Sequence, residues 1–416
     1  MIPLLLAVLG LAALAHVLVQ HGRFLGALRR RPTPPRRSSY PSVSVVRPVR
    51  GRDVGAEENF VAALDTGYPG EVETIFVVDG EDDDAFPLLQ AVISAHRATG
   101  APGTARLIVA GSPPPGRTGK LNAMMAGMRV ALGDLVAFGD SDSRPDREVL
   151  RVLVETLVGT AGAGSAFAPV VTPDPALTAG DVGYALMING LYGPAVALSA
   201  AATGDLPFIM GQLMVVRRSA LDAVGGLSCA EGHLVDDMQI GASLAAAGWR
   251  NVPSIHPLRI VTGGMDLQSF LKLMRRWLFF QRGGLPHSFT APLWLRGFEF
   301  GFGLAAGVGL LATGHPVEAV PPLLVMIAVA WSVAALHRAF GGAPIAIRHL
   351  LVPFGLFLAG PLAHLAAILK PAVQWRGRDY SVDARARLDA GARRDAEEAT
   401  RRGERHDDAA VARSRS

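Results

Sequence analysis

Long apolar stretches lie near both ends of the chain and enclose a middle region with a different pattern. The first stretch, residues 2–19, carries no charge over 18 residues, which is the lower limit for a helix that spans a membrane. Three further stretches lie toward the C-terminus, at about residues 293–313, 319–336 and 349–369. Because hydrophobic residues make up 50% of the chain, this pattern predicts an integral membrane protein.

The basic residues indicate on which side of the membrane the middle region lies. No basic residue precedes the first apolar stretch, whereas several arginines follow it, beginning with Arg23 and Arg29. This order is typical of an uncleaved anchor whose following domain is cytoplasmic. The net charge is only +4, and the arginines gather beside apolar stretches. We therefore attribute the positive charge to the orientation of the membrane segments, and we expect no nucleic-acid binding.

The last apolar stretch has two interpretations. Four full crossings would place the C-terminal tail outside, yet that tail is rich in arginine and the positive-inside rule favours the cytoplasm. Pro353 and the pair Gly360-Pro361 interrupt the stretch, so a re-entrant or interfacial segment is the alternative to a crossing. We expect a cytoplasmic tail on a multi-pass protein of the inner, cytoplasmic membrane.

From residue 43 onward, short apolar runs alternate with segments of helical periodicity. The strand candidates are residues 43–46, 74–78, 106–109 and 135–138, and the helix candidates are residues 57–64, 86–96, 120–132 and 146–158. Such alternation with short links predicts an α/β domain with a mainly parallel, Rossmann-like sheet. Ligands bind beyond the carboxyl ends of the strands in sheets of this kind, so residues after each strand are site candidates.

These patterns divide the chain into six segments. They are an anchor (1–20), a basic linker (21–40), the α/β domain (41–260), an amphipathic interface region (261–290), transmembrane or re-entrant helices (291–372) and a basic tail (373–416). The interface region suits a helix that lies on the membrane and guides an acceptor. The tail has almost no large apolar residues beyond residue 383, so we expect it to be disordered or loosely helical. Cys229 is the single cysteine, which excludes an intrachain disulfide.

The triplet Asp140-Ser141-Asp142 closes the apolar run that ends at Gly139. Two carboxylates separated by one residue at a strand end can share a divalent metal with a diphosphate that the metal neutralises. A plain turn is the alternative, because Asp and Ser both favour turns.

Two further candidates follow other predicted elements of the α/β domain. Asp79, after the second strand, can accept hydrogen bonds from a uracil or a ribose, with Asp82 and Asp83 as alternatives in the same acidic loop. Lys120, at a helix start, brings a cation and free backbone N–H groups together, which suits a diphosphate.

The remaining candidates lie nearer the C-terminal apolar stretches. Asp237 follows Asp236 at the start of a predicted helix and can take a proton from an acceptor hydroxyl. Arg276 can hold a leaving diphosphate, and Trp277 can stack on a sugar or pack at the membrane edge. Structural alternatives are a helix cap for Asp237 and positive-inside anchoring for Arg276.

As a series, these motifs resemble the ceramide glucosyltransferases. The matching segments are residues 42–53 (SVSVVRPVRGRD), 140–146 (DSDSRPD), 224–227 (VGGL), 236–237 (DD), 247–250 (AGWR) and 375–378 (WRGR). The family's Q/R-x-x-R-W motif keeps Arg276 and Trp277, while Leu273 replaces its first residue.

The resemblance implies a GT-A catalytic domain, a UDP-sugar donor, a divalent metal (Mg²⁺ or Mn²⁺) and a lipid acceptor at the cytoplasmic membrane face. Bacterial relatives include hopanoid-associated glycosyltransferases, so ceramide and hopanoid polyols are both candidate acceptors. The implied roles are metal ligands for Asp140 and Asp142, donor binding for Asp79, Lys120 and Asp140, general base for Asp237, and catalysis of an inverting transfer with Arg276 and Trp277. A processive polysaccharide synthase, a polyprenyl-phosphate glycosyltransferase and a non-catalytic membrane scaffold are the alternatives.

Overall fold

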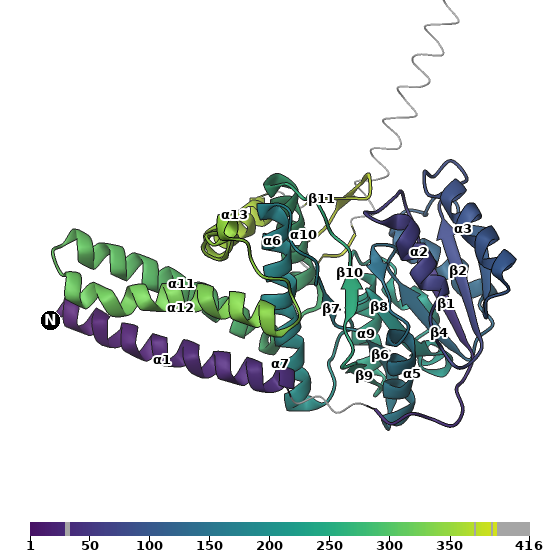
Figure 1. The fold of residues 1–416 in the computed structure, drawn as a ribbon, viewed down its shortest axis with the longest axis horizontal. Helices are drawn as coiled ribbons and strands as arrows, with labels where there is room; N and C mark the ends of the chain where they lie inside the picture. Colours follow the sequence, from purple (N-terminus) through teal and green to yellow (C-terminus); the bar gives the residue numbers. More distant parts are fainter. Residues whose placement is uncertain (30–33, 370–371, 384–385, 389–416) are drawn as a thin grey trace, which may run out of the picture.

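The computed structural model describes residues 1–29, 34–369, 372–383 and 386–388. The predicted tail beyond residue 388 and residues 30–33 of the predicted linker lie outside the described residues. An α/β domain and a long bundle of helices make up the described chain, with a layer of helices between them (Figure 1).

The α/β domain is built on a seven-stranded sheet of order β3-β2-β1-β4-β8-β6-β9. Its strands are β1 (Val43–Pro48), β2 (Val72–Val78), β3 (Thr104–Val109), β4 (Leu135–Gly139), β6 (Ala163–Phe167), β8 (Leu213–Arg217) and β9 (Arg250–Pro253). β8 runs antiparallel to β4 and β6, and the other neighbours in this sheet pair in parallel. The mainly parallel sheet predicted from the sequence is therefore confirmed.

Helices cover both faces of this sheet because each contributes one apolar side. They are α2 (Ala56–Leu64), α3 (Phe86–Thr99), α4 (Gly119–Val130), α5 (Val149–Gly159), α8 (Arg218–Ala223), η2 (Gly226–Ala230) and α9 (Asp236–Ala246). Phe60 and Leu89 of α2 and α3 pack with Phe76 of β2 in one cluster, whereas Leu121 of α4 and Leu153 of α5 belong to a second, larger one. Each of these buried side chains contributes about 1.5–3 kcal/mol.

Two small sheets bring distant segments to the carboxyl edge of the main sheet. One consists of β5 (Ser143–Arg144), β10 (Leu258–Ile260) and β7 (Val170–Val171), and the other is the hairpin of β11 (Ala372–Trp375) and β12 (Arg378–Ser381). The hairpin corrects the sequence analysis, which placed residue 373 onward in an irregular tail. Val373 and Tyr380 are buried in the larger core cluster, and this burial holds the hairpin on the α/β domain.

The layer between domain and bundle contains a helix interrupted by a π-helical turn and a second, amphipathic helix. The first comprises α6 (Ala179–Ala185), η1 (Leu186–Tyr192) and α7 (Gly193–Thr203), and the second is α10 (Leu267–Gly284). Asn189 of η1 is fully buried and exchanges hydrogen bonds with the backbone of Thr172. The stretch 179–203 is long and apolar enough to span a membrane, but 67% of its most apolar window is buried within the protein. We therefore interpret it as part of the layer.

In the bundle, α1 (Ile2–Arg29), α11 (His287–Ala312) and α12 (Pro316–Ala339) lie side by side, whereas α13 (Val352–Leu369) runs in a different direction (Figure 1). The short turn η3 (Ile347–His349) precedes α13. The four apolar stretches found in the sequence are all among the helices with the length and composition of membrane spans. Gly303 lets α11 approach α12 closely, since a Cβ there would lie 2.6 Å from the carbonyl oxygen of Pro322.

Candidate active site

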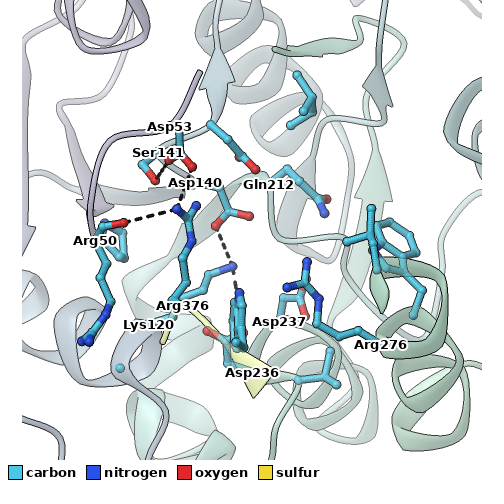
Figure 2. A pocket seen from close by; sticks show the side chains of 18 of the residues that line it. Arg50, Asp53, Lys120, Asp140, Ser141, Gln212, Asp236, Asp237, Arg276 and Arg376 are labelled. Atoms are coloured by element: carbon cyan, nitrogen blue, oxygen red, sulfur yellow. Dashed lines mark hydrogen bonds and ion pairs between the residues drawn. The ribbon is translucent and has the colours of Figure 1, made fainter. Parts of the chain in front are cut away.

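A cavity of about 430 Å³ lies beyond the carboxyl ends of β1, β2 and β4, at the edge where the sequence predicts a site. Its walls also include the starts of α4 and α9, the helix α10 and the β11–β12 hairpin. The site residues predicted from the sequence all line this one cavity: Asp79, Lys120, Asp140, Asp142, Asp237, Arg276 and Trp277. Figure 2 shows the side chains of acidic and basic residues facing one another across it.

The loop after β4 is held from beneath by a buried arginine. Arg47, at the end of β1, donates hydrogen bonds to the carbonyl oxygens of Asp140 and Ser143, the latter at 2.9 Å. The hydroxyl of Ser141 donates to Oδ2 of Asp53 at 2.6 Å. These bonds engage the loop backbone and Ser141 and not the carboxylates of Asp140 and Asp142, which both line the cavity.

The two carboxylates suit a divalent cation that is shared with a ligand. Oδ1 of Asp142 is buried without a hydrogen-bond partner in the described chain, and burial, together with the negative charges of Asp140 and Asp53, raises the pKa of Asp142 to about 6. A cation between Asp140 and Asp142 would relieve this repulsion, and carboxylate oxygens are the ligands that Mg²⁺ and Mn²⁺ prefer. Within the described residues, no cluster of three or more His, Cys, Asp or Glu side chains could hold a metal alone. A cation held by Asp140 and Asp142 would need further ligands, of the kind that the oxygens of a diphosphate provide.

Lys120 lies at the start of α4, where the side chain of Thr118 caps the helix by accepting the N–H of Leu121 at 3.1 Å. Its Nζ is 2.7 Å from Oδ1 of Asp140 and 4.0 Å from Oδ1 of Asp236 (Figure 2). Burial alone lowers the pKa of Lys120, but Asp140, Asp236 and Asp237 together raise it well above its ordinary value. Lys120 is therefore a permanent cation among these carboxylates.

Asp237 is fixed by backbone groups at the start of α9. Its Oδ2 accepts the N–H of Gly211 at 2.6 Å, and its Oδ1 accepts the N–H of Met238 at 2.8 Å. A Cβ on Gly211 would lie 2.4 Å from the Cβ of Asp237, so this approach requires a glycine. Burial raises the pKa of Asp237 to about 6, because the attraction of Lys120 only partly offsets burial and the repulsion of Asp236. A carboxylate with this pKa suits a general base near neutral pH.

Asp79 is the member of the acidic loop that reaches the cavity. It pairs with Arg50 and, at 3.0 Å, with Nη2 of Arg378 from the hairpin. Asp83 instead accepts hydrogen bonds from the N–H groups of Gly51 and Ala85, at 3.0 and 2.9 Å, and so shapes the loop. Neither Asp82 nor Asp83 is among the residues that line the cavity.

The opposite wall is aromatic and apolar. The rings of Trp277 and Tyr192 meet edge to face with centroids 4.9 Å apart, and the guanidinium of Arg276 lies 5.7 Å from the ring centroid of Trp375. Leu273, at the position where the resembling family has Gln or Arg, lines the cavity as part of this wall. The wall also includes Tyr184, Met210, Met238, Met265 and Leu285.

Several polar residues of the cavity were not singled out as site residues from the sequence. They are Arg50, Asp53, Gln212, Arg376 and Arg378. Arg50 and Asp53 lie in the run 42–53 that carries the family resemblance, and Arg376 and Arg378 lie in the run 375–378. These motifs were therefore signals of site residues, whereas nothing in the sequence marks Gln212.

Comparison with known proteins decides the family of this chain. The sequence profile of glycosyl transferase family 21 matches residues 3–388. The chain belongs to this family. Ceramide glucosyltransferases 3 and 1 of Caenorhabditis elegans are 24% and 23% identical to it over 350 residues, covering 82% and 83% of this chain and 73% and 72% of their own length.

A solved structure supports the fold of this family 21 protein. A mannosyltransferase from Pyrobaculum calidifontis, in complex with GDP-Man and Mn²⁺, superimposes with a TM-score of 0.53 at 17% identity, covering 87% of this chain and 99% of that one. The family 21 chain is a glycosyltransferase of GT-A fold, as its sequence motifs predict.

Proposed function

We propose that this family 21 glycosyltransferase transfers a sugar from a UDP-sugar to a hydroxyl of a membrane lipid, with inversion and with a divalent metal. The observation that carries the proposal is the two-sided cavity. Acidic and basic side chains beyond the strands form one side, and the apolar wall of α10 and η1, which adjoins the bundle, forms the other. The ceramide glucosyltransferase relatives support a lipid acceptor, for which ceramide is the first candidate and a hopanoid polyol the second.

The charged side of the cavity accounts for donor binding. Asp79 binds the nucleoside, and Lys120 and Arg276 face the diphosphate as permanent cations. A Mg²⁺ or Mn²⁺ ion at Asp140 and Asp142 would neutralise part of the diphosphate charge.

Asp237 and the apolar wall account for acceptor chemistry. The carboxylate of Asp237 takes the proton of the acceptor hydroxyl while that oxygen attacks the anomeric carbon from the face opposite the leaving group. The bond from the anomeric carbon to the diphosphate breaks, UDP departs, and Arg276 stabilises its added negative charge. Trp277 shapes the acceptor side. An α-linked donor then gives a β-glycoside.

The proposed enzyme acts at the cytoplasmic face of the inner membrane. In this arrangement α1, α11 and α12 cross the membrane and α13 lies along its surface. The segments on either side of α13 support this topology, because Phe340, the C-cap of α12, packs on Gly193 of the layer helix α7 and Val373, after α13, is buried in the core of the α/β domain. Because the chain before α13 contacts the layer and the chain after it enters the α/β domain, both flanking segments lie on the same side of the bundle, and α13 between them does not cross the bilayer.

Cysteine labelling tests this topology. In a Cys229→Ser background, we expect Thr313→Cys, in the turn between α11 and α12, to react with a membrane-impermeant maleimide in intact cells. Asp379→Cys, on the exposed side of the hairpin, should react only after the cells are lysed. Labelling of Asp379→Cys in intact cells would show that α13 crosses the membrane.

Product analysis tests the function itself. Membranes that contain the protein are incubated with radiolabelled UDP-glucose, UDP-galactose or UDP-N-acetylglucosamine, with ceramide or bacteriohopane polyol, and with or without Mn²⁺. We expect label in an alkali-stable lipid that carries one sugar, and only when the metal is present. Label in a polymer would indicate a polysaccharide synthase, and label in an acid-labile lipid would indicate a polyprenyl-phosphate glycosyltransferase.

A further inference from the structure

The β11–β12 hairpin reaches the donor side of the cavity from the far end of the chain. Trp375, Arg376, Arg378 and Tyr380 all line the cavity, as do Pro48 at the end of β1 and Asp79 directly after β2. Figure 1 shows the hairpin beside the α/β domain, between that domain and α13. The buried ring of Tyr380 anchors it, so its charged turn is held over the site.

Both arginines of the hairpin pair with carboxylates that line the cavity. Nη1 of Arg376 lies 2.6 Å from Oδ1 of Asp53 and donates to the carbonyl oxygen of Arg50 at 3.2 Å (Figure 2). Nη2 of Arg378 lies 3.0 Å from Oδ2 of Asp79. The apolar side of the hairpin is buried separately, through Val373 and Tyr380.

Arg378 also lies against the start of α4. A Cβ on Gly119 would come within 2.1 Å of Nη1 of Arg378, so this guanidinium touches the first turn of the helix that carries Lys120. Arg276 of α10 adds a further cation to those of Lys120 and the hairpin, and its Nε is buried without a hydrogen-bond partner in the described chain. Cations from the hairpin, from α4 and from α10 thus line the same cavity.

We propose that the hairpin closes the donor site and that Arg376 and Arg378 bind the donor diphosphate. On donor binding, the two guanidinium groups exchange Asp53 and Asp79 for phosphate oxygens, and Asp79 becomes free to bind the nucleoside. The planar fork of arginine suits this role, since it binds phosphate through two parallel hydrogen bonds. The proposal rests on the proposed function in one respect, namely that the donor is a nucleoside diphosphate sugar.

Titration with UDP and with uridine, which lacks the diphosphate, tests whether the hairpin binds the diphosphate. The intact protein and its Arg376→Gln and Arg378→Gln variants are titrated with UDP and with uridine, in detergent with Mn²⁺, by calorimetry. We expect each variant to bind UDP about tenfold or more weakly and uridine within about twofold of the original protein. Arg378→Lys should recover part of the UDP affinity, and Arg129→Gln, an exposed arginine on α4, is the matched control that changes neither affinity.

The outcomes separate this proposal from the proposed function. An equal loss of UDP and uridine affinity would show that the hairpin only maintains the shape of the site, and unchanged UDP affinity would also overturn the proposal. If the original protein binds GDP in place of UDP, the proposed donor is wrong. The hairpin is then tested in the same way with GDP and guanosine, and the variants should lose affinity for GDP but not for guanosine. The proposed lipid acceptor is tested separately, by identification of the labelled product.

Discussion

Asp237→Asn is expected to lower the turnover of sugar transfer by about a thousandfold while UDP still binds. The amide keeps the size of the side chain, and its oxygen can still accept the N–H of Gly211. It cannot take a proton, and removal of a general base costs about 10²- to 10⁴-fold in rate. Single-turnover transfer to lipid and calorimetric titration with UDP measure the two effects on the same preparation.

The control for this experiment is Asp222→Asn, an exposed aspartate on α8, which should leave both measurements unchanged. The base role also predicts how the original enzyme responds to acid. Because the pKa of Asp237 is raised to about 6, the carboxylate becomes protonated below that pH, and turnover should fall with decreasing pH through about pH 6. Turnover above a tenth of the original value in Asp237→Asn would transfer the base role to Asp236, whose Oδ2 is buried and has no hydrogen-bond partner in the described chain.

Elements that bury one regular face were predictable from the sequence. β1, β2, β3 and β4 and the helices between them follow the predicted order, with ends that differ by a few residues, because alternation and helical periodicity report burial directly. The cavity follows from the same order, since Asp79 and Asp140 each come directly after a strand of one parallel sheet.

The hairpin of residues 372–381 was not predictable in this way. Its run of charged residues with a few apolar ones resembles an irregular tail, and only its contacts with the α/β domain make Val373 and Tyr380 part of a core. Its position also depends on the direction of α13, which hydropathy alone leaves open between a crossing and a surface segment. The partners of Arg376 and Arg378 lie more than about 290 residues away in sequence, so no local pattern reports them.

The polar side of the cavity shows why local sequence patterns identify site residues but not the ion pairs that these residues form. The start of a helix predicts a cation beside a diphosphate at Lys120, yet its pairing with Asp140 and its proximity to Asp236 depend on where β4 and α9 end. Lys120 is consequently the counter-charge that allows these carboxylates to be buried together, in addition to the diphosphate contact proposed for it.

Lys120→Met is therefore expected to lower the free energy of unfolding by about 3–5 kcal/mol at pH 7.5, because it leaves buried carboxylates without a counter-charge. The apolar side chain keeps nearly the same length, so loss of charge dominates the change. Thermal unfolding in detergent, followed by intrinsic tryptophan fluorescence, measures the effect. Lys272→Met, an exposed lysine on α10, is the matched control and should shift stability little.

The destabilisation should depend on pH in a defined direction. The pKa values of Asp142 and Asp237 are already raised to about 6 in the folded protein, against an ordinary value of 3.8, and loss of Lys120 raises them further. The folded variant therefore binds more protons than the unfolded chain above pH 4, and its stability falls as pH rises. The difference in the free energy of unfolding between the variant and the original protein should become smaller when the pH is lowered from 7.5 to 5.5. If this difference stays constant over the same range, lost packing and not lost charge accounts for the destabilisation.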